Sequence, residues 1–531
     1  MKTTFKIQHI VGCTLLMLST MAAAQGAAGD GIGSFEIARF DVAGDTTLGA
    51  QPIAQLLTPF TGRSRNFGDV QHAIEALEGA YRARGLSLVR VTLPEQELNQ
   101  GTVRLVVVES RIGSVKVLGN QQFSSANIRN SVPQLREGQA PNVADISASL
   151  RLANENPAKK TVLSLQNGSN DDEVNAVLQV TEDKPWLASV TLDNAGNDAT
   201  GKTQMTAQYQ HFNVADLDHT LSLQFTTTLE QPSRVGVYGV GYHIPLYSKT
   251  DALDFYGSYS DVDSGTVSAG AFNLQVSGKG SVWGGRYTHT LARQGTYESR
   301  IAFGLEQKAF QNNLGYQGVQ IGNDVSVRPL SLMYAGDLAQ NTGTTNYYLM
   351  GVRNLPGGDR GGDADFARVR VGASNTYGLW RFGISHTQTL PADWQLRLLF
   401  NGQWTNDALV PGEQFGAGGA ASVRGYSERA IADDQGGVGN VEIYTPGLCS
   451  SASTPALQCR LLAFYDRATV RHNNALPGER SDANLASAGV GLRLGVGKHM
   501  ALQMDVGQVL ADSDTQSKGD TRVHAKINLA Y

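Results

Sequence analysis

From Trp186 to the end of the chain, apolar and polar residues alternate in one stretch after another. Leucine and phenylalanine alternate with serine, glutamine and threonine at Leu221–Leu229, and the same period of two returns at Trp394–Trp404 and Val523–Tyr531. A period of two places successive side chains on opposite faces of a β-strand. We therefore expect strands with one apolar and one polar, often charged, face, and we find no helical pattern after Trp186.

The position of the tryptophans distinguishes a membrane barrel from a soluble sandwich, which also alternates. Trp394 and Trp404 lie ten residues apart on the apolar face, which is about 33 Å along a strand and about 25 Å when the strand tilts by about 40°. That is the height of the apolar band of an outer-membrane barrel. At about 10 residues per strand plus turns, residues 185–531 predict a transmembrane antiparallel β-barrel of about 16 strands, and an even number closes without an edge.

The part of the chain before the barrel has a different pattern, with two compact α+β units at 35–110 and 111–184. Each is predicted to run strand, helix, helix, strand, strand. The expected elements are 35–42, 51–57, 67–84, 87–93 and 102–109 in the first unit, and 115–118, 124–131, 143–154, 161–166 and 173–181 in the second. The repeated order indicates an internal repeat. A single α+β domain of about 150 residues is the alternative.

The chain begins with Lys2 and Lys6, an apolar run at 10–18 and Ala22-Ala23-Ala24. This pattern is typical of a secretory signal peptide at 1–24, followed by a short segment at 25–34. Charged residues make up 17% of the chain and its net charge is −5, so nothing indicates nucleic-acid binding. Removal of the signal peptide leaves two cysteines, Cys449 and Cys459, for which a local disulfide is the simplest state. No third ligand at metal spacing accompanies them, so no metal is predicted.

Several short motifs occur in an order that resembles a known family. They are Tyr81-Arg-Ala-Arg-Gly85, Leu93-Pro-Glu-Gln96, Leu152-Ala-Asn-Glu-Asn-Pro157, Asp193-Asn-Ala-Gly196, Tyr242-His-Ile-Pro-Leu246, Val423-Arg-Gly-Tyr426 and Phe464-Tyr-Asp-Arg-Ala468. Together they resemble the two-partner secretion transporters of the ShlB/FhaC/HecB family, a branch of the superfamily that includes BamA. The resemblance covers essentially the whole mature chain. It implies that the two α+β units are periplasmic POTRA domains and that the barrel lies in the bacterial outer membrane.

The resemblance also implies a site. The loop at 411–437 is expected to fold back into the barrel lumen, where Arg424 of the motif Val423, Arg424, Gly425 and Tyr426 pairs with Asp466 of the strand that carries Phe464, Asp466 and Ala468. Ala468 stands where the family usually has glycine. By alternation Arg467 faces lipid, at a cost of about 2–4 kcal/mol near the midplane unless it lies near an interface or a bulge. Segment 25–34 is too short for the pore-plugging helix of some relatives.

The resemblance implies export of a specific large exoprotein, such as a haemolysin, haemagglutinin or adhesin, to the cell surface. The POTRA domains are expected to capture the unfolded partner by β-augmentation, and the barrel is expected to conduct it. Lipid and the barrel-assembly machinery are the other expected partners. The alternatives are an assembly factor of the BamA type and a passive porin. An enzyme is not predicted, because the histidines are scattered and no Gly-x-Ser-x-Gly elbow occurs. No cofactor is predicted either, since Gly278-Lys279 lacks the rest of a phosphate loop.

Overall fold

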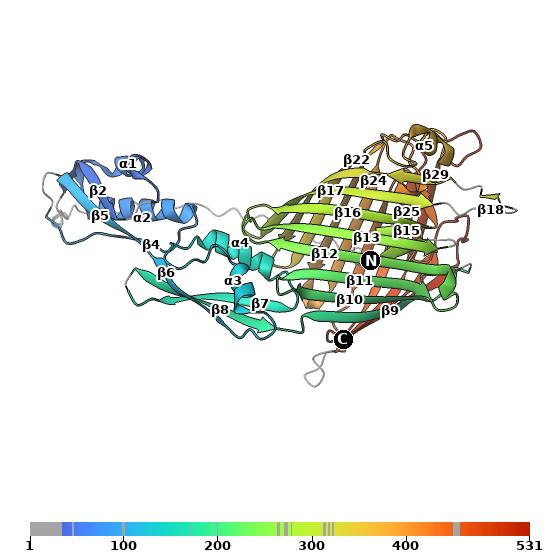
Figure 1. Ribbon diagram of the computed structural model, residues 1–531, viewed down its shortest axis with the longest axis horizontal. Coiled ribbons are helices and arrows are strands. Elements are labelled where there is room, and N and C mark those ends of the chain that lie inside the picture. The colour runs from blue at the N-terminus through green and yellow to red at the C-terminus, as the bar shows by residue number, and fades with distance from the viewer. Residues whose placement is uncertain are drawn as a thin grey trace, which may run out of the picture. The chain divides into compact units, whose positions relative to one another are not determined.

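A computed structural model describes residues 34–44, 47–97, 101–170, 172–198, 200–262, 266–269, 274–277, 279–311, 315–316, 319–320, 323–449 and 457–531. The predicted signal peptide and residues 25–33 lie outside these ranges. The chain divides into two compact units, one that ends at Glu109 and one from Ser110 to Tyr531 (Figure 1). No helix in the described ranges is both long and apolar enough to cross a membrane.

The first unit is a three-stranded sheet covered by helices. Its elements are β1 (Phe35–Ile37), β2 (Arg39–Gly44), α1 (Ala50–Leu57), β3 (Gly62–Arg65), α2 (Phe67–Ala83), β4 (Val89–Thr92) and β5 (Thr102–Glu109), with sheet order β2-β5-β4. Helix α2 begins as predicted, because the Asn66 side chain accepts from the backbone of Gly68 and Asp69 while Asp69 accepts from the Asn66 backbone. Its apolar stripe, which includes Leu77 and Tyr81, is buried in the core of this unit.

The same α+β arrangement follows immediately. Its elements are β6 (Arg111–Leu118), α3 (Ser125–Asn130), α4 (Val143–Ala153), β7 (Lys159–Asn167) and β8 (Glu173–Glu182). The sheet order β6-β8-β7 matches the order β2-β5-β4 of the first unit. In the two sheets, β6 pairs in parallel with β8 as β2 does with β5, and β7 pairs antiparallel with β8 as β4 does with β5. The internal repeat is therefore present in the structure. We call residues 111–184 the second α+β unit.

The rest of the chain closes into an antiparallel barrel, which confirms the predicted fold class. The barrel strands are β9 (Trp186–Asp193), β10 (Gln204–Val214), β11 (His219–Thr228), β12 (Val235–Leu246), β13 (Asp251–Val262), β16 (Lys279–Thr290), β17 (Tyr297–Gln311), β20 (Val325–Val327) with β21 (Pro329–Ala339), β22 (Gly343–Asn354), β23 (Gly378–Thr389), β24 (Gln395–Trp404), β27 (Gln435–Tyr444), β28 (Leu457–Arg471), β29 (Asp482–Val496), β30 (Met500–Val509) and β31 (Thr521–Ala530). β20 and β21 both pair with β17 and form one interrupted strand, so the barrel has 16 strands. Pairing of β31 with β9 closes it.

The two faces of the barrel wall differ as the alternation predicts. On β28, Phe464, Asp466 and Ala468 are buried on the inward face, whereas Tyr465 and Arg467 are exposed on the outward face. Outward side chains on other strands are mostly large and apolar: Trp283 is 57% exposed and Trp404 is 49% exposed. An outer surface of this kind is stable only in lipid, and a closed barrel leaves no unpaired strand edge there.

Strand direction assigns each turn to one of two rims. β8 leads directly into β9, so the near rim is the end of the barrel at which β9 begins, and the far rim is the opposite end. Helix α5 (Asp363–Val369) lies in the far-rim loop between β22 and β23 (Figure 1). The alternation predicted no helix after Trp186, and that prediction is wrong here, because seven residues are too few for a helical apolar period to be visible.

A disulfide joins Cys449 to Cys459 at the near rim, with 5.3 Å between the two Cα atoms. Cys449 follows β27, and Cys459 lies at the start of β28. The cross-link thus closes the turn between these two strands, whose inward faces form the site described below.

The second α+β unit is attached to the near rim through a buried ion pair. Lys159 Nζ lies 2.5 Å from Asp218 Oδ2, and neither side chain is more than 2% exposed. Asp218 belongs to the turn between β10 and β11 and also accepts from Tyr247 Oη and, at 2.6 Å, from Asn156 Nδ2. Burial lowers the pKa of the Lys159 ammonium, and Asp218 opposes that shift.

The turn that receives Lys159 is strained. Ala215, Asp216 and Asp218 all have positive φ, between 54° and 64°. Such conformations persist only when the surroundings hold them. Asn127 of the second α+β unit donates to the Asp216 carbonyl at 2.8 Å, and the Ser124 backbone donates to its carboxylate at 3.2 Å. The turn and the second α+β unit therefore stabilise each other.

We predict that Asp218→Asn will destabilise this junction by about 3–5 kcal/mol, because it leaves the Lys159 ammonium buried and uncompensated. Adding Lys159→Met should restore much of the loss. The measurement is the temperature at which trypsin releases the second α+β unit from detergent-solubilised protein. The matched control is Asp183→Asn in the exposed Lys498–Asp183 pair, which should cost less than about 1 kcal/mol. Equal effects at Asp218 and Asp183 would contradict the assignment.

Candidate functional site

The connection between β24 and β27 folds back along the inner wall of the barrel, and we call residues 405–434 the lumen loop. It contains a helical turn at Pro411–Glu413 and a hairpin of β25 (Phe415–Ala417) with β26 (Ile431–Asp433). The predicted boundary of 411–437 is too long at its end. Residues 435–437 belong to β27, where Gly437 pairs with Gly402 on one side and with Thr469 on the other.

At the tip of this loop, the Arg424 guanidinium meets the Asp466 carboxylate in a fork-to-fork pair. Arg424 Nε donates to Oδ2 at 2.8 Å and Nη2 donates to Oδ1 at 2.7 Å, while the Arg424 backbone N–H also donates to Oδ2, at 3.1 Å. Arg424 is 3% exposed and Asp466 is fully buried. This planar geometry suits arginine and not lysine. A third partner, Asn440, donates to Asp466 Oδ1 at 2.8 Å.

Phe464 and Ala468 lie on the same inward face of β28 as Asp466. The guanidinium carbon of Arg424 lies 3.5 Å from the centre of the Phe464 ring, which is a cation–π contact. Ala468 packs in a buried cluster with Val423 and Tyr426. Phe464, Asp466 and Ala468 thus contact the tip through stacking, charge and packing respectively.

The charges around the tip balance. Arg424 Nη1 also lies 2.8 Å from Glu442 Oε1 and 3.6 Å from Asp505 Oδ1. Arg397 pairs with Glu442 at 3.4 Å, and Arg493 pairs with Asp505 at 2.9 Å. Three guanidinium groups therefore face the three carboxylates of Asp466, Glu442 and Asp505. Because buried charge is costly unless it is compensated, this balance is what permits the network to form.

Glycine is required where the tip touches the wall. Gly425 has a φ of +94°, which favours glycine, and its backbone N–H donates to His524 Nε2 at 3.0 Å. A Cβ at Gly507 of β30 would lie 2.7 Å from the backbone N of Gly425. Tyr426 then extends past this contact, and its hydroxyl donates to the carbonyls of Ala486 and Ala511 at 3.0 and 2.6 Å. Each residue of the tetrad thus has a distinct contact.

Two further anchors hold the base of the lumen loop, and neither was among the residues predicted from the sequence. The buried Glu413 carboxylate lies 3.0 Å from Lys308 Nζ on β17 and 3.1 Å from Arg381 Nη2 on β23. Asp434, also buried, forms a bidentate ion pair with Arg370, which follows α5. These partners are 32 to 105 residues apart in sequence, so no local pattern relates them.

Asp433, Asp434 and His472 bring potential metal-ligand atoms within 4.8 Å of one another. Each already has protein partners: Asp434 is bound by Arg370, and His472 Nδ1 contacts Asp433 Oδ1 at 2.5 Å. Arg370 Nη2 lies 3.0 Å from the other His472 ring nitrogen. A cation would have to displace this guanidinium. The group is best explained as an ion-pair network that ties the lumen loop to the far rim.

Comparisons with known proteins agree with this arrangement. A family model described as haemolysin secretion/activation protein ShlB/FhaC/HecB matches residues 172–494, and a model of the ShlB-type POTRA domain matches residues 35–110. The heme/hemopexin transporter protein HuxB of Haemophilus influenzae is 21% identical over 86% of this chain and 80% of its own length. The outer membrane transporter CdiB of Escherichia coli is 23% identical over 76% of this chain and 68% of its own.

Solved structures show the same fold. CdiB from Escherichia coli superposes with a TM-score of 0.77 at 20% identity and covers 96% of this chain and 93% of its own. BamA from Haemophilus ducreyi lacking POTRA domains 1–3 gives a TM-score of 0.52 at 15% identity, covering 94% of this chain and 100% of its own.

We predict that Arg424 and Asp466 act as one unit. Arg424→Ala and Asp466→Ala should each lower the free energy of unfolding in detergent by up to about 3–5 kcal/mol, less whatever water in the lumen recovers. The double variant should cost clearly less than the sum. Arg424→Lys should restore only part, because an ammonium cannot form the bidentate fork.

Arg429→Ala is the matched control for these variants. Arg429 lies in the same loop but donates to the carbonyls of Pro411 and Gln414, within the loop itself. Its loss should not couple to Asp466→Ala. Additive effects of Arg424→Ala and Asp466→Ala in a correctly inserted barrel would show that the two groups do not depend on each other.

Proposed function

The chain belongs to the ShlB/FhaC/HecB family of haemolysin secretion/activation proteins and is a two-partner secretion transporter of the outer membrane with periplasmic POTRA domains; we propose that it exports one specific large exoprotein, captured in the periplasm and conducted through the barrel. The near rim is then periplasmic and the far rim extracellular. The family is one of transporters and not a known class of enzymes.

The observation that carries the capture step is the open edge of β7. β7 is an edge strand of the β6-β8-β7 sheet and the longest edge strand of the two POTRA sheets within the described residues. The Thr161 backbone N–H donates a hydrogen bond to the Asn154 side chain, and the Thr161 carbonyl accepts one from it. These two backbone groups therefore point away from β8. By alternation the backbone groups of Leu163 and Leu165 also point to the open edge. An extended, unfolded chain can add to such an edge by β-augmentation.

β7 is also the strand that begins with Lys159, which is buried at the near rim against Asp218. An exoprotein segment bound to β7 would therefore be held in a fixed orientation relative to the barrel entrance. The lumen loop lies along the inner wall past that entrance. Its anchors at Glu413, Asp434 and Arg424 consequently decide how wide a conducting path can open.

The assembly factor of the BamA type shares the fold, as the superposition shows. The match of the ShlB/FhaC/HecB model over more than half of the chain favours an exporter. A passive porin would need neither a periplasmic strand edge nor a loop fixed by buried ion pairs. The two protein-handling functions differ in how many proteins depend on them, which provides the test.

We predict that deletion of the gene will remove a single large protein from the cell surface and the medium. A plasmid-borne copy of the gene should restore that protein. Quantitative mass spectrometry of the medium and of purified outer membranes measures this. The abundance of other outer-membrane barrels should remain unchanged. A general loss of barrels would instead support the assembly factor, and no change in any surface protein would contradict export.

We predict that Leu165→Pro will reduce secretion of that protein far more than Leu165→Ala. Both variants lose the same apolar packing, but only proline removes the N–H that points to the open edge. The readout is secretion by the deletion strain that carries each variant. Circular dichroism of the variant purified from isolated outer membranes is the folding control. Equal secretion by the two variants would exclude β-augmentation at this position and leave export itself untouched.

A further inference from the structure

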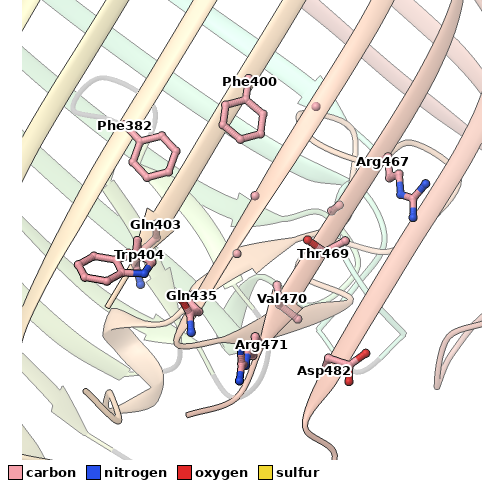
Figure 2. A pocket seen from close by; sticks show the side chains of 14 residues that line it. Phe382, Phe400, Gln403, Trp404, Gln435, Arg467, Thr469, Val470, Arg471 and Asp482 are labelled. Carbon is pink, nitrogen blue, oxygen red and sulfur yellow. The ribbon is translucent and has the colours of Figure 1, made fainter. Parts of the chain in front are cut away.

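An apolar groove with a cationic side lies on the outward, lipid-facing wall of the barrel. It has a volume of about 660 Å³ and is formed across β23, β24, β27, β28 and the start of β29. Figure 2 shows Phe382, Phe400 and Trp404 on one side of it, with Arg467 and Arg471 on the other. All of these residues lie outside the contacts of the lumen loop described above.

The groove exists because glycines replace side chains on its floor. Two outward-facing rows cross the strands in register: Phe382 pairs with Gly402, Gly402 with Gly437 and Gly437 with Thr469. In the next row, Phe400 pairs with Gly439 and Gly439 with Arg467. The pleat directs every one of these positions to the lipid. The rings of Phe382 and Phe400 lie over Gly402 and Gly437, whereas no atom lies closer than 3.9 Å to the Cβ position of Gly439. The open part of the floor is therefore the backbone around Gly439, between these rings and the basic wall.

The basic wall is unusual for a surface that faces lipid. Arg467 and Arg471 are both exposed on the outward face of β28, and neither guanidinium group forms a hydrogen bond or ion pair with any residue that the structure describes. An outward arginine costs about 2–4 kcal/mol at the bilayer midplane and about 0–1 kcal/mol near the interface. Asp482, which pairs in register with Arg471, is the groove's single carboxylate, so the lining carries a net positive charge.

The groove lies in the outer half of the membrane. β28 begins at the near, periplasmic rim and ends at Arg471, and β24 ends at Trp404 at the same extracellular level. Arg467 is four residues below Arg471, about 13 Å along the strand and about 10 Å in height after tilt. Its long side chain can reach toward the head-group level. Both cations are thus available to anionic groups of the outer leaflet.

We propose that this groove binds one phosphorylated glycolipid of the outer leaflet, namely the lipid A anchor of lipopolysaccharide. The apolar floor and the rings of Phe382, Phe400 and Trp404 would take an acyl chain. The guanidinium groups of Arg467 and Arg471 would bind the phosphates, for which their fork geometry is suited. The charge pattern selects this occupant over a neutral lipid, and the position selects the outer leaflet. Arg467, which alternation places against lipid, is then a ligand-binding residue.

The test uses the full mature protein in phosphatidylcholine nanodiscs, with hexa-acylated bisphosphoryl lipid A as the probe and native mass spectrometry as the readout. We expect one lipid A per barrel. Arg467→Gln with Arg471→Gln should weaken binding by at least about tenfold, which is about 1.4 kcal/mol. Gly439→Leu should do so too, since a Cβ there meets no atom closer than 3.9 Å and the larger side chain fills the groove without disturbing the wall.

Matched controls separate the site from general surface effects. Arg353→Gln changes an exposed outward arginine at the far end of β22 that does not line the groove. Gly285→Leu fills an outward glycine of β16 whose Cβ would meet Phe255 at an ordinary 3.5 Å. Neither should alter binding. Dephosphorylated lipid A and phosphatidylglycerol should bind at least about tenfold more weakly.

Four binding outcomes would overturn the proposal. Three are equal binding by the double arginine variant, equal binding by Gly439→Leu, and equal binding of the dephosphorylated probe. Tighter or equal binding of phosphatidylglycerol would assign the groove to a two-chain anionic lipid instead of lipid A and would likewise reject it. Arg467→Leu gives a separate measurement: a misplaced arginine predicts a more heat-stable barrel with and without lipid A, whereas a lipid A site predicts loss of the heat stabilisation that lipid A gives the wild type.

Discussion

The buried pair of Arg424 and Asp466 is the interaction on which the interior of this barrel depends. A long glycine-rich loop loses on the order of 1–2 kcal/mol of backbone entropy per ordered residue, and the lumen loop has only a small apolar cluster at its tip to offset that cost. Directional, charge-assisted hydrogen bonds supply the remaining stabilisation that ordering the loop requires. Once a guanidinium is buried there, the wall must provide compensating carboxylates, and the carboxylates of Glu442 and Asp505 in turn require Arg397 and Arg493.

One strand shows how a barrel wall separates two chemistries. Asp466 and Arg467 are neighbours in the chain, yet the pleat of β28 directs the first into the lumen and the second to the lipid. The inward charge is balanced by the lumen loop. The outward charge of Arg467 has no protein partner within the described residues. The groove beside it offers space for the lipid proposed above, which would supply the opposite charge. Both the candidate site at Asp466 and the proposed lipid site at Arg467 therefore follow from a single alternation.

At the near rim, β7 contains both an attachment to the barrel and an open sheet edge. The first residue of that strand, Lys159, fixes the second POTRA domain to the strained turn that contains Asp218, and the following residues present the open edge. The motif residue Asn156 and Tyr247, which directly follows the motif Tyr242-His-Ile-Pro-Leu246, also bind Asp218. Motifs that look unrelated along the chain thus meet at one carboxylate.

The sequence by itself determined the repeated α+β order, the barrel and the approximate number of its strands, because periods of two and of 3.6 are local properties of the chain. It also indicated Arg424 and Asp466, through the resemblance of two short motifs. Only the tertiary structure decided the partners of Glu413 and Asp434, the packing of Lys159 against Asp218 and the glycine-floored groove. Those contacts join residues far apart in the chain, and strand register brings them together. The alternation of each strand fixes which face is inward, but the exact register also depends on turn geometry and on the stagger of the closed barrel, which no single strand determines.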